Sequence, residues 1–396
     1  MTEPVAQLPI ERTAGCPFDP PAELAAIRAE APLRRLTFAD GHLGWLATGH
    51  AANRAILADT RFSSRMVNQH NPFPGLEIPE GLAETPGDLT LMDRPEHTRF
   101  RQLLAGKFTV RRMRLLTERV TEVTAQCLDA MAAAGPPVDL VEAFAKPIPA
   151  LLISELLGVP DREREQFLNL VGQLGGADVP VEDQYAAYAE IGTIIYGLVL
   201  TKRAAPTDDL LSDLTTSDLT DEELAGVGTF LLAAGLDTTA SMLGLGTFAL
   251  LSNPDQFAAL RDDPTLTESA VEELLRYLSI AHTGVRAALE DVEVDGQLIR
   301  AGESVVVSVM AANRDPERFP DPDALDVRRK ATGHLAFGHG IHQCLGQQLA
   351  RVELRVAFPA LLARFPTLRL AVPPEEVPIR PAINVHGIHR LPVTWG

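Results

Sequence analysis

The sequence is poor in cysteine, in aromatic residues and in net positive charge. Its three cysteines are Cys16, Cys127 and Cys344, an odd and sparse set that forms no disulfide framework and suits a reducing cytoplasm. Aromatic residues make up only 5% of the chain, so we expect a core of Leu, Ala and Val. The net charge of −18 argues against binding to nucleic acid, whose phosphates would repel it, and against a basic membrane-surface protein.

The N-terminal residues also lack a basic start followed by an apolar run, so we expect neither a secretion signal nor a membrane anchor. Residues 226–251 are long and apolar enough to cross a bilayer, and Asp237 is their one charge. Five glycines and a central Asp fit a membrane span poorly. We expect instead one long helix, apolar on every side because it is buried in a large globular domain.

Helical periodicity dominates the chain, and many of the periodic segments follow Asp, Ser, Thr or Pro, which are helix start signals. The expected helices are 21–31, 49–58, 95–107, 109–134, 140–157, 161–174, 181–203, 220–251, 254–262, 267–278 and 345–362. The expected strands are 33–38, 44–47, 290–294, 297–300, 304–309, 368–371 and 389–393, with a type I′ turn at Asp295-Gly296. The succession of many helices with a few short strands predicts a mainly α fold with small antiparallel β-sheets, in one domain of residues 1–396.

The most informative segment is 337–346, Phe-Gly-His-Gly-Ile-His-Gln-Cys-Leu-Gly. It places Cys344 in a glycine-rich loop at the start of an expected helix, where free backbone N–H groups and the helix dipole favour thiolate over thiol. Gly338 and Gly340 allow backbone angles denied to other residues and let a flat partner approach the chain. The pattern indicates a sulfur ligand beneath a large planar metal cofactor; the plainer interpretation is a buried free cysteine in a glycine turn.

This segment resembles the haem-ligand motif F-G-x-G-x-H-x-C-x-G of the cytochrome P450 superfamily. Its fixed positions are filled by Phe337, Gly338, Gly340, His342, Cys344 and Gly346. The resemblance covers nearly the whole chain and is to soluble bacterial members, especially actinobacterial enzymes that tailor secondary metabolites or oxidise xenobiotics. It implies the cytochrome P450 fold, haem b (iron protoporphyrin IX) bound through Cys344, and insertion of one oxygen atom from O2 into a substrate.

Two more motifs resemble those of the family and imply cofactor and oxygen chemistry. His97 and Arg101, one helical turn apart, resemble the family's propionate-binding pair, to which the resemblance adds Arg286 and His342. In Ala234-Gly235-Leu236-Asp237-Thr238, Gly235 removes side-chain bulk where dioxygen must sit, and Ala234 is expected beside the cofactor in the pocket. Thr238 would hydrogen-bond the dioxygen, and Asp237 would relay protons, although an Asp satisfied by water or a salt bridge is the plainer interpretation.

A further motif has a structural role. Glu273-Leu274-Leu275-Arg276 resembles the family's E-x-x-R, in which the two charges pair with a later Arg to fix the loop before the cysteine. The run Leu325-Asp326-Val327-Arg328-Arg329 resembles the bacterial F-D-x-x-R motif with Leu in place of Phe, so Arg329 is the expected partner. The nearby string 316–319 is the alternative, but its register is wrong.

Two irregular segments, 64–89 and 172–183, are expected to cover the pocket above the haem. The predicted pocket residues are Met66, His70, Phe73, Leu76, Leu89, Leu174, Val179, Leu231, Leu232, Ile280, Val285 and Ile388. They are mostly apolar and fit a large hydrophobic small-molecule substrate. By resemblance we favour a macrolide-type polyketide such as a polyene, with a steroid or other polycyclic xenobiotic as the alternative. His70 either approaches the iron when substrate is absent or is an ordinary polar residue.

Residues 94–114 hold seven basic side chains and one acid, which reverses the sign of the chain's overall charge. The segment is either a solvated helix face or a docking patch for an acidic ferredoxin, itself reduced by an NAD(P)H-dependent reductase. A non-catalytic haem sensor or carrier and a peroxide-using enzyme remain as alternatives, and the intact Asp237-Thr238 pair disfavours both. We expect a cytoplasmic monomer.

Overall fold

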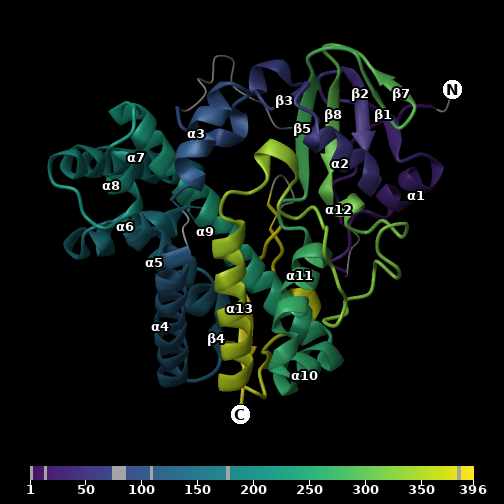
Figure 1. Ribbon diagram of the computed structural model, residues 1–396. Helices are drawn as coiled ribbons and strands as arrows, with labels where there is room; N and C mark the ends of the chain where they lie inside the picture. The colour runs from purple at the N-terminus through teal and green to yellow at the C-terminus, as the bar shows by residue number, and fades with distance from the viewer. Residues whose placement is uncertain (1–2, 13–15, 74–85, 108–109, 175–178, 381–384) are drawn as a thin grey trace.

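The computed structural model describes residues 3–12, 16–73, 86–107, 110–174, 179–380 and 385–396. Helices make up the left and lower parts of the molecule in Figure 1, and the largest sheet lies at the upper right, close to the N-terminus. The helix α13 runs through the middle of the view, and its N-terminal end lies beneath the loop that contains Cys344. The cysteine loop therefore lies between the helical part and the sheet.

The described α-helices are close in number and position to those expected from periodicity. They are α1 (Ala22–Glu30), α2 (His50–Ala58), α3 (Glu96–Ala105), α4 (Val110–Ala134), α5 (Pro147–Leu156), α6 (Asp161–Gln173), α7 (Val181–Ala204), α8 (Leu210–Leu214), α9 (Asp221–Ser252), α10 (Pro254–Asp262), α11 (Thr267–Leu278), α12 (Val309–Ala312) and α13 (Gln347–Arg364). The expected helix 140–157 is divided, because a π-helical turn, Val141–Ala145, precedes Pro147 at the start of α5.

The described strands form three small sheets. They are β1 (Leu33–Thr37), β2 (Leu43–Ala47), β3 (Phe62–Ser63), β4 (Val138–Asp139), β5 (Thr283–Ala288), β6 (Val292–Val294), β7 (Gln297–Ile299), β8 (Ser304–Ser308), β9 (Arg369–Leu370) and β10 (Pro392–Thr394). The sheet orders are β1-β2-β8-β5-β3, β4-β10-β9 and β6-β7. Most pairs are antiparallel, as expected, whereas β2 and β8 pair in parallel. Asp295 and Gly296 both have positive φ between β6 and β7, as a type I′ turn requires.

The long apolar segment is the central helix of the core. A capping box begins α9, in which Thr220 accepts from the Glu223 backbone N–H while the Glu223 carboxylate accepts from the Thr220 N–H. Within the described residues α9 is the one helix with the length and hydropathy of a membrane span, and 67% of its most apolar stretch is buried inside the protein. Its C-terminal half packs in the main core with α4, α11 and α13.

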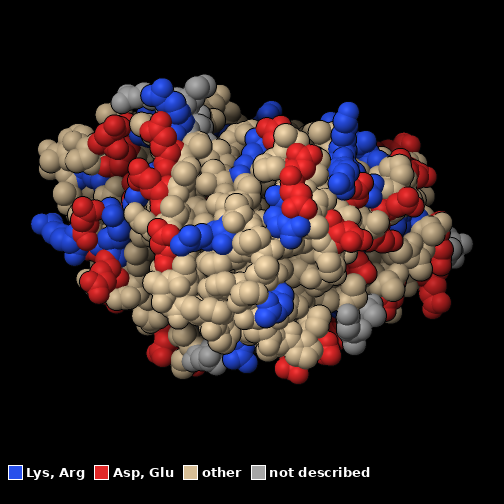
Figure 2. Space-filling view, turned by 90° about the horizontal axis from the view of Figure 1, so that it is seen from below, with Lys and Arg blue, Asp and Glu red and all other residues tan. Residues whose placement is uncertain are grey.

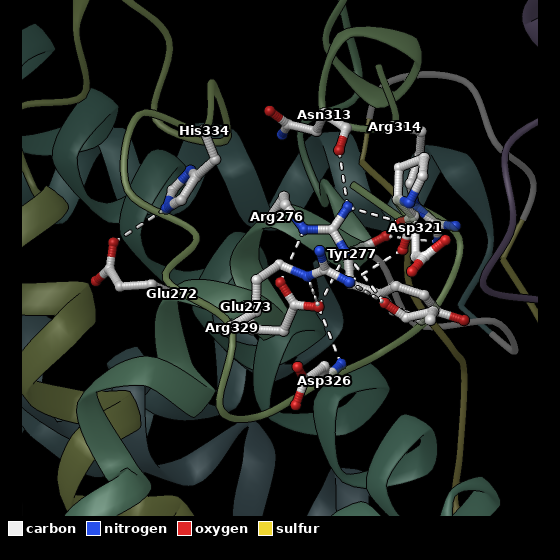
Figure 3. A network of polar contacts seen from close by, with 12 residues as sticks. Glu272, Glu273, Arg276, Tyr277, Asn313, Arg314, Asp321, Asp326, Arg329 and His334 are labelled. Atoms are coloured by element: carbon white, nitrogen blue, oxygen red, sulfur yellow. Dashed lines mark hydrogen bonds and ion pairs between the residues drawn. The ribbon is translucent and has the colours of Figure 1, made fainter. Parts of the chain in front are cut away.

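A buried ion-pair network joins α11 to the loop that precedes the cysteine (Figure 3). Glu273 and Arg276 are fully buried and pair through two contacts of 2.8 and 2.9 Å. Arg329 Nε lies 3.0 Å from Glu273 Oε1, which is the contact that the sequence pattern predicts. Arg276 also donates to the backbone oxygens of Asn313 and Pro322, both at 2.8 Å. These bonds compensate the desolvation of the two charges and fix the path of the chain before the cysteine loop.

Charged side chains are interspersed over the surface in spite of the acidic balance. The face in Figure 2 is largely uncharged in its middle, with acidic groups toward both sides and basic groups among them. Many charged side chains form surface ion pairs, such as Arg364 with Asp129 at 3.2 Å. The net charge of −18 is therefore distributed and makes no single acidic pole on this face.

We predict that Arg276→Met lowers the free energy of unfolding by about 3–5 kcal/mol, because the Glu273 carboxylate keeps its burial and loses its main partner. Guanidinium denaturation of the purified protein measures this loss. The matched control is Arg364→Met, whose exposed pair with Asp129 is worth at most about 1 kcal/mol. Equal effects of the two substitutions would contradict the structural role of the network.

Candidate active site

A cavity of about 480 Å³ lies between α9 and the cysteine loop. Its walls come from α3, α5, α9, β5 and the first turns of α13, and they are largely apolar. From α9 they include Phe230, Leu231, Ala234 and Thr238, and opposite these lie Phe337, Gly338, Cys344 and Gly346. The structure thus brings the expected oxygen motif and the expected cysteine loop to the same cavity.

The backbone of the loop fixes Cys344. Its N–H donates to the Phe337 carbonyl at 2.8 Å, and Gly338 and Gly340 have φ of 68° and 72°, which L-residues with side chains rarely adopt. Protein surrounds the sulfur, yet Cys344 keeps exposed surface because it faces the cavity. The helix α13 begins at Gln347, so the cysteine precedes its first turn.

The protein alone does not favour the thiolate at Cys344, contrary to the sequence-based expectation. Burial raises the pKa of this thiol above its ordinary value. The backbone N–H groups of Gly346 and Gln347 and the nearby Arg101 and Arg351 guanidiniums oppose that effect but do not overcome it. Stabilisation of a thiolate here therefore requires an additional positive charge, such as that of a coordinated metal ion.

The two loop glycines have different roles. A Cβ on Gly340 would lie 2.2 Å from the Leu57 carbonyl oxygen at the end of α2, so Gly340 is required by helix packing. This corrects the expectation that it makes room for a flat partner. A Cβ on Gly338 would meet only the His342 carbonyl, at 3.8 Å, and one on Gly346 would meet nothing within 4 Å. Gly338 and Gly346 both line the cavity.

Four basic side chains line the cavity near the cysteine loop: His97 and Arg101 of α3, Arg286 of β5, and His342. Burial lowers the pKa of Arg286 to about 10 and the pKa of His342 to about 3. It also lowers the pKa values of His97 and Arg101. The rings of His97 and His342 are 4.4 Å apart, so α3 and the loop bring them together.

These basic groups fit an anionic cofactor. Among the described residues neither Arg101 nor Arg286 forms an ion pair. The Asp93 carboxylate is near enough to raise the pKa of Arg286, but the Arg286 guanidinium donates to the Val285 carbonyl, at 2.7 Å. Buried guanidinium groups are costly without an acceptor of opposite charge. The two propionates of haem would provide that charge, while neutral His97 and His342 could donate hydrogen bonds. The cavity thus suits a haem with its sulfur ligand on one face.

On the α9 side, small residues open a space beside a threonine. Ala234 is exposed although it lies midway along a buried helix, and a Cβ on Gly235 would meet only Ile153, at 3.7 Å. The Thr238 hydroxyl donates to the Ala234 carbonyl at 2.8 Å and lines the cavity. Its lone pairs remain available to accept a hydrogen bond from a ligand.

Asp237 is held by a residue that no sequence motif indicated. Arg380, in the C-terminal segment, forms two contacts with its carboxylate, of 2.5 and 3.1 Å, and lies 3.3 Å from Ser241 Oγ. Asp237 is not among the cavity-lining residues. The arrangement is therefore the salt bridge that the sequence left open as an alternative to a free relay, and any proton transfer through Asp237 must take place beside Arg380.

The predicted pocket residues divide into two groups. Leu89, Leu231 and Ile280 line the cavity. The other described ones are not among the residues that line it: Met66, His70, Phe73, Leu174, Val179, Leu232, Val285 and Ile388. Phe73 and Val285 pack in the N-terminal core, Ile388 packs against Gly244 in the main core, and Leu232 is buried in the core around α7. Leu76 lies outside the described residues.

His70 faces away from the cavity. Its Nδ1 is 2.7 Å from Asp40 Oδ2, and its ring stacks on His42 at 3.6 Å. Its backbone N–H donates to Ser304 Oγ at 3.0 Å. These contacts attach the start of the proline-rich segment to β8 and its neighbouring turn. The structure thus supports the plainer interpretation of His70 as a partly exposed polar residue.

Two features near the cysteine loop were missed. Glu272 pairs with Arg351 at 2.6 Å and with His334 at 3.0 Å, and Arg351 stacks over the Phe337 ring at 4.6 Å, which joins α11, α13 and the loop. Glu353 of α13 lines the cavity, is fully buried, and its Oε2 has no hydrogen-bond partner. Burial raises the pKa of Glu353 to about 8, so it is neutral in the folded protein at pH 7.

We predict that Glu353→Gln stabilises the protein and weakens its pH dependence. Between pH 4.5 and 8 the unfolded chain releases the Glu353 proton while the folded chain retains it. The free energy of unfolding therefore falls as pH rises, by up to about 1.4 kcal/mol per pH unit. Denaturant titrations at pH 5 to 8 measure the slope, with the exposed Glu268→Gln as the control. Identical slopes for wild type and Glu353→Gln would contradict a neutral buried carboxyl.

Three comparisons with known proteins agree with this geometry. The family model for Cytochrome P450 matches residues 201–386. Cytochrome P450 105C1 of a Streptomyces species is 53% identical over 96% of both chains. Pentalenic acid synthase of Streptomyces avermitilis is 44% identical over 100% of this chain and 98% of its own. The crystal structure of CYP105P1 in complex with filipin I superposes with a TM-score of 0.88 at 43% identity, over 99% of both chains.

These relatives cover essentially the whole chain at identities far above those at which only a fold is shared. The matched residues include the helices and sheets described above. They also include the cavity, where the cysteine-containing loop lies opposite the helix that carries Thr238. The chain belongs to the cytochrome P450 family of soluble bacterial haem monooxygenases.

Proposed function

We propose that this monooxygenase oxidises a macrolide-type polyketide, of the polyene kind, during secondary-metabolite biosynthesis. The observation that carries the chemistry is Cys344 facing a cavity lined by two partly buried guanidinium groups, those of Arg101 and Arg286, that form no ion pair within the described residues. The substrate class rests on the apolar walls of that cavity and on the similarity to CYP105P1, whose structure was determined with filipin I.

The proposed cofactor is haem b, with Cys344 as its iron ligand and Arg101, Arg286, His97 and His342 around its propionates. A thiolate-bound haem iron supplies the activation of dioxygen, because the sulfur donates electron density that favours O–O cleavage. Phe337, held by the Arg351 guanidinium, would pack beside the sulfur. The apolar walls exclude bulk water from the reacting centre.

The chain's own contribution to the reaction is orientation and proton supply. Thr238 would accept a hydrogen bond at the oxygen site, and its own hydroxyl proton is directed to the Ala234 carbonyl. Asp237 would exchange protons with solvent beside Arg380. Each turnover takes two electrons and two protons; one oxygen atom enters the substrate and the other leaves as water.

The proposed electron donors are a ferredoxin and its NAD(P)H-dependent reductase, acting on a cytoplasmic, single-domain protein. The basic segment 94–114 supports the docking of an acidic partner, but less strongly than its sequence suggests. Arg99 pairs with Glu223 and Asp218, and Arg112 pairs with Asp213. Arg114 is exposed and has no ion pair among the described residues. Arg94 is exposed and likewise has no ion pair among the described residues, so the pairing of Arg99 and Arg112 leaves part of the positive charge of the run available for docking.

We predict that Cys344→Ser abolishes the red-shifted Soret band of the reduced, carbon-monoxide-bound protein, because a hydroxyl is a far weaker donor to iron than a thiolate. Cys127→Ser is the control, since Cys127 is buried in the main core away from the cavity. Absorption spectra of both variants check the assignment. A Cys344→Ser spectrum like that of wild type would refute Cys344 as the ligand.

We also predict that a polyene macrolide shifts the haem spin state with a Kd at least about tenfold below that of a steroid, a difference of about 1.4 kcal/mol. Spectral titration of the loaded protein with one representative of each class measures the two constants. Tighter binding of the steroid would replace the proposed substrate class with the polycyclic alternative, without affecting the assignment of the cofactor.

A further inference from the structure

A buried polar cluster lies outside the cavity and has no role in the function derived so far. It consists of Arg12, His282, Arg314 and His386, which come from four distant parts of the chain. His282 and His386 are completely buried, and Arg314 is 3% exposed. Three of these side chains bond to the backbone of residues 17–19, so that segment brings them together.

Hydrogen bonds define how the side chains converge. Arg12 Nη1 donates to the Phe18 and Asp19 carbonyls at 3.2 and 2.9 Å. Arg314 Nη2 donates to the Phe18 carbonyl at 3.3 Å, and Figure 3 shows Arg314 beside Tyr277. His386 Nε2 is 2.8 Å from the Pro17 carbonyl. The carbonyls of residues 17–19 therefore each accept a hydrogen bond from Arg12, Arg314 or His386.

The remaining polar atoms of the cluster are buried and have no partner among the described residues. They are Arg12 Nε and Nη2, His282 Nε2, Arg314 Nε and His386 Nδ1. Buried polar groups without partners are rare in proteins, and ordered water is the usual way in which they are satisfied. Five such atoms around one short segment indicate a hydrated site.

The chemistry of these atoms selects water over an anion. The His386 Nε2 atom must carry the proton, because its partner is a carbonyl, so a neutral His386 presents Nδ1 as an acceptor. Burial lowers the pKa of His386 to about 3 and that of His282 to about 4, which keeps both rings neutral. Arg12 and Arg314 present donors only. Only a molecule that both donates and accepts can satisfy the whole set.

One end of the cluster lies at the surface, and the other lies near the groups that hold Asp237. At the outer end, the Asp19 carboxylate, 40% exposed, accepts from Arg314 Nη1 at 3.1 Å. At the inner end, the Arg380 backbone N–H donates to the Gly387 carbonyl at 2.9 Å, and a Cβ on Gly387 would lie 2.7 Å from Ser241 Oγ, so the backbone of the residue after His386 is close to the groups that hold Asp237. His282 Nδ1 also contacts Thr283 Oγ1 at 2.8 Å, and Thr283 lines the cavity.

We propose that Arg12, His282, Arg314 and His386 bind a chain of ordered water molecules that carries protons from the surface near Asp19 to the Arg380–Asp237 pair. Water passes protons by alternately donating and accepting, which this set of unpartnered atoms permits. The proposal rests on the proton-supply role given to Asp237 above. It makes His386 a positioning residue for water and not a residue that touches substrate or haem.

The first test examines the water itself. A high-resolution crystal structure of the haem-loaded protein should show water about 2.7–3.2 Å from His386 Nδ1 and from Arg12 Nε. The ¹⁵N shifts of His386 should report a neutral ring protonated at Nε2 at pH 7. A direct hydrogen bond from Arg12 to His386 Nδ1 with no water between them would overturn the proposal.

The second test uses His386→Gln, in which the amide NH2 can keep the Pro17 contact while the acceptor at the Nδ1 position is lost. We expect the ratio of product formed to NADPH consumed to fall about tenfold, less than the 10²–10⁴-fold for removing a proton-transfer group, because Asp237 keeps its own exposed side. The solvent isotope effect on the remaining turnover should rise.

His50→Gln is the matched control, since His50 is buried and its Nε2 lies 2.9 Å from the Gly333 carbonyl elsewhere in the fold.

Two further variants separate this proposal from the function on which it rests. Arg380→Leu should cause a similar loss, and combining it with His386→Gln should add little, because both act on one path. If Asp237→Asn leaves coupling and the isotope effect unchanged, the role of Asp237 fails. If Asp237→Asn changes both and His386→Gln changes neither, Asp237 is supplied through its own exposed side and the water path is refuted.

Discussion

The structure depends on keeping charged groups inside a protein whose interior is built from aliphatic side chains. Glu273 and Arg276 solve this problem by pairing with each other and with backbone carbonyls. Arg101 and Arg286 form no ion pair within the described chain. A haem would complete them, which makes the cofactor part of the electrostatic balance of the fold as well as the source of its chemistry.

Local motifs made much of the fold and part of the site predictable. The helices follow a strong 3.6-residue period, and Glu273, Arg276 and His97 meet partners that short spacings or familiar motifs indicate. The residues that were missed or misplaced depend on distant segments. Arg380 meets Asp237 although 143 positions separate them along the chain, and β3 has only two residues, so no local period indicates either feature.

Pocket residues were hard to predict for a related reason. An apolar residue in a loop can be buried against any of several hydrophobic cores or against the cavity, and the sequence does not show which of them the folded chain brings close. Phe73 and Val285 joined the N-terminal core, whereas Leu89 and Ile280 reached the cavity. His70 pairs with Asp40 and stacks on His42, two polar neighbours whose proximity only the folded β1–β2 region creates.

The packing of Gly340 against α2 determines where the Cys344 sulfur lies. Its backbone rests against the carbonyl of Leu57, so the end of α2 acts as a stop for the loop. Because only a short stretch of chain joins Gly340 to Cys344, the position of Gly340 limits how far the sulfur extends into the cavity. Lengthening or shortening α2, a helix that contributes only Leu57 to the cavity wall, would move Gly340 and, with it, the Cys344 sulfur relative to the cavity.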